Sequence, residues 1–220
     1  MIVAIDGPAG AGKSTVARGV ARALGIGYLD TGAMYRALTL VALRSGVPCD
    51  DDAALARLAR EHPVHLEQGP AGVRVIIRGD DVTAAIRETE VTASVSEVAA
   101  HPGVRLEMVA RQRDLMAQGD WVCDGRDIGS VVFPGAEVKV FLTASVSERA
   151  RRRHAELVAA GETVDLRAIR DGVERRDHAD SSRAASPLVV ADGAAVLDTT
   201  GLGVDEVVAR IAGMARDVTS

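Results

Sequence analysis

The amino-acid sequence predicts an α/β fold in which a parallel five-stranded sheet is flanked by helices. Short apolar runs rich in valine and isoleucine alternate along the chain with longer stretches whose apolar residues have helical spacing. Strands that alternate with helices are joined by crossover connections, and they therefore lie parallel in one sheet. A glycine-rich turn joins the first apolar run to the first helical stretch. The length of 220 residues fits a single domain that carries insertions.

Glycine, proline and aspartate residues mark the ends of the elements in the first part of the chain. Apolar residues recur at helical spacing from Lys13 to Leu24, and Gly25 and Gly27 end that helix. The pair Asp30-Thr31 is expected to cap the next helix, with Thr31 as one candidate cap. The predicted elements here are a strand at 2–5, a helix at 13–24, a strand at 27–29, and helices at 33–44 and 53–61.

The pattern changes between residues 62 and 90. Alternating residues on either side of a turn at 69–72 predict an antiparallel hairpin, and residues 79–81 predict a further turn. We expect this segment to form a small insertion with its own sheet. The remaining predicted elements are helical stretches at 91–117, interrupted at 101–103, and at 147–185, with strands at 121–124, 138–142 and 195–198.

Composition and charge exclude several classes of protein. The chain has 26 basic and 31 acidic residues, a net charge of −5, and only 2% aromatic residues. We expect no nucleic-acid partner, because duplex binding needs a basic surface and single strands need stacking aromatics. Two cysteines without metal-ligand spacing and a start without a secretory signal predict a reduced, cytoplasmic protein. We expect no membrane partner either, since no apolar stretch is long enough to cross a bilayer.

The strongest local signal is the segment GPAGAGKS, which matches the pattern G-x-x-x-x-G-K-[ST] in full. Glycines let the backbone curl so that successive N–H groups point at phosphate oxygens, and the following helix adds its positive N-terminal end. Lys13 is expected to reach the β- and γ-phosphates, while the hydroxyl of Ser14 or Thr15 binds Mg²⁺. The sequence thus predicts a phosphate-binding loop (P-loop) for a nucleoside triphosphate. Its expected residues are Gly7, Pro8, Ala9, Gly10, Ala11, Gly12, Lys13, Ser14 and Thr15.

Charged residues at the ends of other elements fit a phosphoryl-transfer site. Asp124 ends a predicted strand, where a carboxylate either holds Mg²⁺ or caps a turn. Gly125, Arg126 and Asp127 follow it, and the two charged residues are expected to project into the same crevice. Arg36 lies early in a predicted helix, where a cation is unfavourable unless an anion binds there. Arg36 is therefore a candidate clamp for an acceptor phosphate.

Arginine is dense in the predicted helices between residues 147 and 185. Arg149, Arg152 and Arg153 share one helix face by their spacing. Each arginine taken alone fits an ordinary exposed face that pairs with Glu148 or Glu156. As a group they also fit a mobile lid, because guanidinium groups bind phosphate in a bidentate manner and a closed lid excludes water.

The whole pattern resembles the bacterial cytidylate kinases, which phosphorylate CMP and dCMP. The matching segments run nearly from end to end: IDGPAGAGKST, YLDTGAMYR, IRETEVTASVSEVAAHPGVR, DGRDIGSVVFP and RRDHADSSRAASPL. The resemblance implies a monomeric kinase that uses ATP and Mg²⁺, with CMP and dCMP as substrates. It also implies one kinase domain with its core at 1–61, 91–146 and 184–220, a nucleotide-binding insert at about 62–90 and a lid at about 147–183.

The resemblance further implies roles for individual residues. Ser96, Arg105 and Asp127 match residues that bind cytosine, whose amino group suits an ionised carboxylate while uracil would be repelled. The implied ribose contacts are Arg176 and Asp180, the acceptor-phosphate region contains Asp30, Thr31, Tyr35, Arg36, Arg126 and Arg183, and the ATP contacts include Arg149 and Arg153. Lys13, Arg126 and Arg183 are the expected catalytic residues, and Ser14 and Asp124 the expected Mg²⁺ ligands.

Two other functions remain open from the residues alone. One is a P-loop kinase for a different acceptor, such as UMP, AMP or shikimate. The other is a non-enzymatic nucleotide switch, since Asp198-Thr199-Thr200-Gly201 matches the D-x-x-G pattern of GTPases. The chain contains no asparagine, so it lacks the guanine-binding motif that would accompany such a switch.

Overall fold

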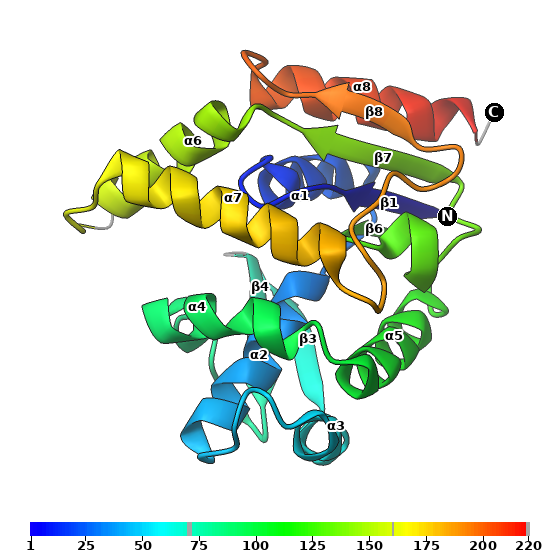
Figure 1. Cartoon of the computed structure of the whole chain (residues 1–220). Helices are drawn as coiled ribbons and strands as arrows, with labels where there is room; N and C mark the ends of the chain where they lie inside the picture. The colour runs from blue at the N-terminus through cyan, green and yellow to red at the C-terminus, as the bar shows by residue number, and fades with distance from the viewer. Residues whose placement is uncertain (70–71, 160, 219–220) are drawn as a thin grey trace. The chain divides into compact units, whose positions relative to one another are not determined.

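The structure is a computed structural model that describes residues 1–69, 72–159 and 161–218 (Figure 1). The chain divides into two compact units, which are described separately below. Unit 1 comprises Met1–Ile26 and Val122–Ser220, and unit 2 comprises Gly27–Trp121. Within the described residues, one sheet has five strands in the order β2-β6-β1-β7-β8 and a second has three, in the order β3-β4-β5. The predicted α/β fold with a five-stranded sheet and a small antiparallel sheet is confirmed.

Unit 1 contains four strands of the large sheet: β1 (Ile2–Asp6), β6 (Trp121–Asp124), β7 (Val138–Thr143) and β8 (Ala195–Asp198). The strand β1 runs parallel to β7, with Val3 opposite Val138, and β7 runs parallel to β8. All five residues of β1 are buried, as expected for a central strand that is covered on both faces. The chemistry-bearing residues that follow β1 and β6 therefore begin at the carboxyl edge of this sheet.

Helices of unit 1 pack on the sheet and on each other. The helix α1 (Lys13–Leu24) buries Val16 and Val20 and ends at Gly25, as the sequence predicts. It packs along α8 (Val204–Asp217), which buries Val207 and Ile211. Two further helices, α6 (Val146–Ala159) and α7 (Leu166–Ser182), pack against one another and form the predicted arginine-rich stretch. In Figure 1 they are the yellow-green and yellow helices.

The helices of unit 2 pack against one another in pairs. Its elements are β2 (Gly27–Asp30), α2 (Thr31–Arg44), α3 (Asp52–Glu61), β3 (Val64–Gly69), β4 (Gly72–Ile77), β5 (Asp80–Asp81), a 3₁₀ turn at Ala85–Arg87, α4 (Thr89–Val98) and α5 (Pro102–Met116). The helix α2 packs on α4, and α3 packs on α5. The Asp52 carboxylate accepts hydrogen bonds from the backbone N–H groups of Gly103 and Val104, and so caps α5 from another helix.

The small sheet differs from the prediction at one point. The hairpin of β3 and β4 is antiparallel, as predicted, with Val64 opposite Ile77. Residues 70–71 of the expected turn at 69–72 lie outside the described residues. Asp80 and Asp81, which the sequence predicts as a turn, instead form a third strand that pairs with β4. Their charged side chains are exposed, so the backbone pairs without burying charge.

Candidate active site

The P-loop links β1 to α1 in unit 1. Lys13 is the first residue of α1, and its Nζ atom donates a hydrogen bond of 2.7 Å to the carbonyl oxygen of Pro8. Its side chain therefore curls back over the loop and is almost fully buried. Gly7 has φ +145°, and a Cβ there would lie 2.0 Å from the carbonyl oxygen of Leu142 on β7. Only glycine allows the loop to approach the strand this closely.

The charge of Lys13 lies in an unfavourable setting without an anion. Burial lowers the pKa of Lys13 well below its ordinary value, and the nearby guanidinium groups of Arg126 and Arg176 lower it further. Asp124 and Asp180 act in the opposite direction. A bound phosphate would favour the charged form of the ammonium group, because an opposite charge within a few ångströms raises the pKa of a cation. The electrostatics of the loop thus favour an anionic ligand.

The structure brings together Ser14 and Asp124, the two residues that the sequence predicts as Mg²⁺ ligands. The Ser14 hydroxyl donates a hydrogen bond of 2.7 Å to Oδ2 of Asp124, which is buried at the end of β6. Hydroxyl and carboxylate oxygens are the ligand types that Mg²⁺ takes in P-loop proteins, where phosphates and water complete the shell. The described residues contain no group of three or more His, Cys, Asp or Glu side chains that could hold a metal. The pair therefore fits Mg²⁺ that arrives with a phosphate ligand. Thr15, the alternative hydroxyl that the sequence predicts, is exposed.

Three arginines of unit 1 surround a buried carboxylate on α7. Nε of Arg126 donates a hydrogen bond of 2.7 Å to Oδ2 of Asp180. Burial would raise the pKa of Asp180, but the guanidinium groups of Arg126, Arg176 and Arg183 hold it below its ordinary value. Arg183 also lies 4.0 Å from Oδ1 of Asp127, which is buried as well. Five of the predicted catalytic and substrate residues thus meet within unit 1.

The two predicted lid arginines differ in their surroundings. Arg149 is 4% exposed, and its guanidinium group donates to the carbonyl oxygens of Ala9 and Ala144. The same group forms an ion pair with Asp177 of α7. Arg153 is partly exposed and pairs with Glu156 at 3.1 Å on its own helix. The structure therefore brings Arg149, but not Arg153, into contact with the P-loop.

The predicted substrate residues of unit 2 lie on three packed helices. On α2, the Arg36 guanidinium donates a hydrogen bond of 2.8 Å to the Thr92 hydroxyl of α4. Arg105 of α5 is buried, donates to the carbonyl oxygen of Ala99, and lies 5.3 Å above the Tyr35 ring. Such a contact is a cation–π interaction that fixes the plane of the guanidinium group. Ser96 lies on α4 and is half-buried.

The prediction that Thr31 caps the second helix is wrong. Asp30 is the cap, because its carboxylate accepts a hydrogen bond of 2.9 Å from the Ala33 N–H. Thr31 is instead the first residue of α2 and is buried. A carboxylate is the better acceptor at a helix N-terminus, where it also meets the positive end of the helix dipole.

Comparison with known proteins identifies the family. The family model described as "Cytidylate kinase" matches residues 3–217. The chain belongs to the cytidylate kinase family. It is 54% identical over 209 residues to the cytidylate kinase of Geobacillus sp. (strain WCH70), and 55% identical over 209 residues to that of Geobacillus kaustophilus (strain HTA426). Each alignment covers 95% of this chain and 93% of the relative.

More distant structures share the fold of this cytidylate kinase family member. A gluconokinase from Sinorhizobium meliloti 1021 superposes with a TM-score of 0.50 at 17% identity, covering 99% of this chain and 93% of that one. This likeness concerns the fold alone. Among the residues that the structure describes, no helix combines the length and the apolarity that a membrane crossing requires.

Two buried residues, Asp6 and Thr199, were given no role from the sequence. The Asp6 carboxylate at the end of β1 accepts hydrogen bonds from Ile128 N–H (2.9 Å) and Gly129 N–H (2.8 Å). It thereby fixes the π-helical turn that begins directly after Asp127. Burial raises the pKa of Asp6 to about 6. The position of Asp6 at the carboxyl end of the first strand was the available signal.

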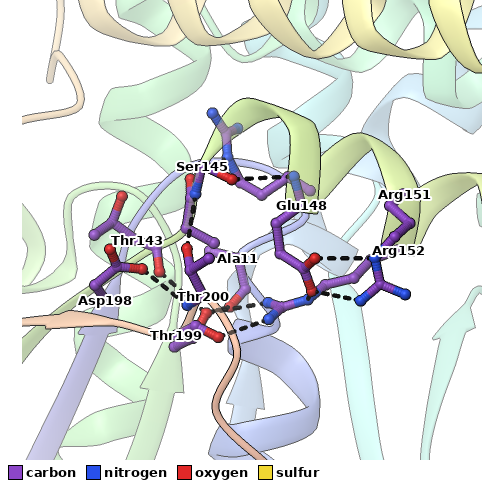
Figure 2. A network of polar contacts seen from close by, with 11 residues as sticks. Ala11, Thr143, Ser145, Glu148, Arg151, Arg152, Asp198, Thr199 and Thr200 are labelled. Atoms are coloured by element: carbon purple, nitrogen blue, oxygen red, sulfur yellow. Dashed lines mark hydrogen bonds and ion pairs between the residues drawn. The ribbon is translucent and has the colours of Figure 1, made fainter.

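The second residue is Thr199, in the turn at 198–201 that follows β8. Its buried hydroxyl lies within a network that joins this turn to α6 and to the P-loop (Figure 2). The D-x-x-G pattern at 198–201 is thus part of a hydrogen-bonded turn, in which Oδ1 of Asp198 accepts from the Thr200 N–H at 2.8 Å.

Proposed function

We propose that the chain transfers the γ-phosphoryl group of ATP to CMP or dCMP, with Mg²⁺, and releases ADP and CDP or dCDP. Family membership over residues 3–217 supports the acceptor, because the curated relatives are named cytidylate kinases. The observation that carries the proposal is the joint placement of Lys13, Ser14 and Asp124 at the P-loop. These three groups provide one cation and two oxygen ligands for a nucleoside triphosphate with its metal.

On the donor side, the residues of the P-loop bind and orient the triphosphate. Its backbone N–H groups and Lys13 would hold the β- and γ-phosphates, and Arg149, which contacts the Ala9 carbonyl, and Arg153 are further candidates for ATP contacts. Ser14 and Asp124 would hold Mg²⁺ with the triphosphate, and the ion would supply positive charge that offsets the charge of the phosphates. Burial lowers the pKa of Lys13. The phosphates of bound ATP would raise it again, because a nearby negative charge favours the charged form of the ammonium group.

On the acceptor side, arginines would neutralise the phosphate of CMP. Arg36, Arg126 and Arg183 have this role in the proposal, with Asp30, Thr31 and Tyr35 nearby in sequence or on the same helix as Arg36. The transition state for phosphoryl transfer is loose and spreads charge over peripheral oxygens, so cations that fix both groups supply most of the catalysis. A phosphate monoester is already anionic near neutral pH, and the scheme therefore needs no dedicated general base.

Specificity would come from groups that match the edge of cytosine. In the proposal, Ser96, Arg105 and Asp127 bind the base, and Arg176 and Asp180 bind the ribose. Cytosine presents an amino donor where uracil presents an acceptor, so an ionised carboxylate such as Asp127 attracts the first and repels the second. The packing of Arg105 on the Tyr35 ring supports the proposed role of Arg105 in binding the base, since a fixed guanidinium plane selects one hydrogen-bonding direction.

A coupled assay with ATP and a panel of acceptors tests the proposal. CMP and dCMP are expected to be phosphorylated far faster than UMP, AMP or shikimate. In the Asp127→Ala variant, kcat/KM for CMP should fall about a hundredfold, because a buried donor–acceptor match is lost. The same variant should lose much less with UMP. Equal losses with CMP and UMP would contradict the assignment of Asp127, and GTP binding without acceptor-dependent turnover would instead indicate a nucleotide switch.

We also infer that the protein acts as a cytoplasmic monomer without a nucleic-acid or membrane partner. The net charge of −5 supports the absence of a nucleic-acid partner, because affinity for nucleic acid depends on cationic contacts with phosphates. Size-exclusion chromatography with light scattering measures the mass directly. A mass of about twice 22.9 kDa in solution would overturn the monomer.

A further inference from the structure

The helix α6 touches the P-loop at two of its glycines. A Cβ atom built on Gly10 would lie 3.1 Å from the Cβ atom of Arg149, and one built on Gly12 would lie 3.7 Å from an Nη atom of Arg152. Both glycines also have positive φ angles, a backbone conformation that residues with a side chain rarely adopt. The position of α6 therefore constrains the shape of the P-loop.

Arg152 ties α6 to the turn that follows β8, whereas Arg149 contacts the P-loop and α7. Its Nε donates a hydrogen bond of 2.8 Å to Glu148 on the same helix. One Nη atom donates to the hydroxyl of Thr199 at 3.0 Å and the other to the carbonyl oxygen of Thr199 at 2.8 Å (Figure 2). Three different nitrogens of one guanidinium group thus donate to three acceptors, which the planar fork of arginine allows and an ammonium group does not.

Thr199 passes this connection on to the P-loop and the sheet. Its hydroxyl lies 3.0 Å from the carbonyl oxygen of Thr143 on β7 and 3.4 Å from that of Ala11 in the P-loop. Its backbone N–H also donates to the carbonyl of Thr143, at 2.8 Å. A hydroxyl has one proton, so it donates to one of these carbonyls while it accepts from Arg152. Without Arg152, this buried hydroxyl loses its donor. The hydrogen bond from the Ser145 N–H to the Thr200 hydroxyl still joins the turn to the start of α6, but it does not involve Thr199.

We propose that Arg152 is a positioning residue for the donor nucleotide, which acts through Thr199 to hold the P-loop in its binding shape. The proposal rests on the function given above in one respect, since that function assigns a nucleotide to this loop. Arg152 does not itself need to touch the nucleotide. The N–H groups of the loop must converge on the phosphates, and a displacement of about 1 Å is enough to weaken binding and catalysis strongly.

Arg151 provides a matched control for the test. It is the neighbouring residue on α6, carries the same charge and also pairs with Glu148, through two hydrogen bonds of 2.8 and 3.0 Å. Its side chain is 69% exposed, whereas that of Arg152 is 23% exposed. The variants Arg151→Ala and Arg152→Ala therefore remove the same charge from the same helix, and only the second breaks the link to Thr199.

Calorimetric titration with ADP and Mg²⁺ measures the effect at equilibrium. The dissociation constant for ADP should rise about tenfold in Arg152→Ala, because the P-loop loses its fixed shape. It should stay within about twofold of the wild type in Arg151→Ala, as for an exposed pair. In the kinase assay, KM for ATP should rise in Arg152→Ala while KM for CMP stays nearly constant. Thermal unfolding of each variant confirms that it is folded at the temperature of the titration.

Substitutions at Thr199 separate position from charge. Thr199→Val leaves every charge in place but removes the hydroxyl, and it should weaken ADP binding about as much as Arg152→Ala. Thr199→Ser keeps the hydroxyl and should restore the affinity. Arg152→Lys keeps the charge but lacks the planar fork, so it should not restore it.

Three outcomes would overturn the proposal. Wild-type affinity for ADP in folded Arg152→Ala would show that Arg152 only stabilises the fold. Full recovery in Arg152→Lys together with no effect of Thr199→Val would show that charge alone matters. Equal losses of ADP affinity in Arg151→Ala and Arg152→Ala would also show that charge alone matters. The titration does not depend on the acceptor, so a failure to phosphorylate CMP would refute the proposed function and leave this test intact, whereas a wild type that binds no ADP would refute both.

Discussion

The two units of the molecule treat charge differently. Among the described residues, six charged residues of unit 1 are buried as whole residues: Asp6, Lys13, Asp124, Asp127, Arg149 and Asp180. In unit 2 the corresponding set has one member, Arg105. Burial of a charge costs free energy unless it is paired and hydrogen-bonded, so unit 1 carries a cost that unit 2 avoids. A charged ligand at the P-loop would offset part of this cost.

This difference fits a division of work between the units. Unit 1 holds the P-loop and the arginines around Asp180, and dry, fixed charges of this kind stabilise a developing charge most strongly. Two of the predicted substrate residues of unit 2, Arg36 and Ser96, are half-buried, and such groups can recognise a ligand and release it. Three others are buried: Thr31, Tyr35 and Arg105. Substitutions in unit 1 should therefore have larger effects than substitutions in unit 2.

The largest effect is expected at Lys13, whose removal would eliminate the buried cation of the P-loop. In Lys13→Ala, kcat should fall about a thousandfold, because the transferred phosphoryl group loses a charge that supports it in the transition state. Initial rates with saturating ATP and CMP measure this. Binding of CMP, measured by calorimetry, is the internal control and should change little. If kcat stayed above about a tenth of the wild-type value, the charge of Lys13 would not be essential to the chemistry.

The second prediction concerns the pH dependence of stability and the buried carboxylate of Asp6. Its pKa is raised from 3.8 to about 6, chiefly by burial, with the charge of Asp127 adding to this effect and hydrogen bonds from Gly129 and Ile128 opposing it. The native state therefore holds this proton at pH values where the unfolded chain has lost it. The free energy of unfolding should fall by up to about 3 kcal/mol from this group as the pH rises from about 4 to about 6. Stability from Asp6 is thus greatest at low pH.

Urea unfolding of the wild type and of Asp6→Asn across this pH range isolates the effect. The difference in the free energy of unfolding between the wild type and Asp6→Asn should change with pH, because asparagine does not titrate. It should become constant above about pH 7. Asp81 of unit 2 is the contrasting control. Hydrogen bonds from Thr83 lower the pKa of Asp81. The free energy of unfolding of the wild type minus that of Asp81→Asn should therefore change with pH in the opposite sense. A pH-independent difference for Asp6→Asn would show that its carboxylate titrates normally.

Local patterns were enough to predict most elements of the fold. The helix α1 has the predicted bounds of Lys13 and Leu24, because apolar spacing and a following Gly25 are both local signals. The strands β6 and β8 likewise occupy the predicted residues 121–124 and 195–198. The short strand at Asp80–Asp81 was missed, since two adjacent acidic residues favour a turn and only their pairing with β4 makes them a strand.

The proximity of site residues could be predicted where each lies beside the carboxyl end of a strand. Ser14 comes soon after β1 and Asp124 ends β6, and the structure shows them in contact, because the carboxyl ends of parallel strands share one edge. No spacing rule links Arg149 to Asp177 or Arg152 to Thr199, which come together through the packing of whole helices. The sequence contained these residues, but it did not show which arginine of α6 is buried.

The smallest of the three effects is expected in unit 2, at Arg36. In Arg36→Ala, KM for CMP should rise about tenfold, because one charged contact with the acceptor phosphate is lost. KM for ATP should stay nearly constant, since the donor loop belongs to unit 1. Arg44→Ala is the matched control, as it removes the same charge from the exposed last turn of α2. A parallel rise of KM for ATP and CMP in Arg36→Ala would contradict the separation of the two roles, because a residue that serves only the acceptor cannot weaken the free enzyme's affinity for the donor.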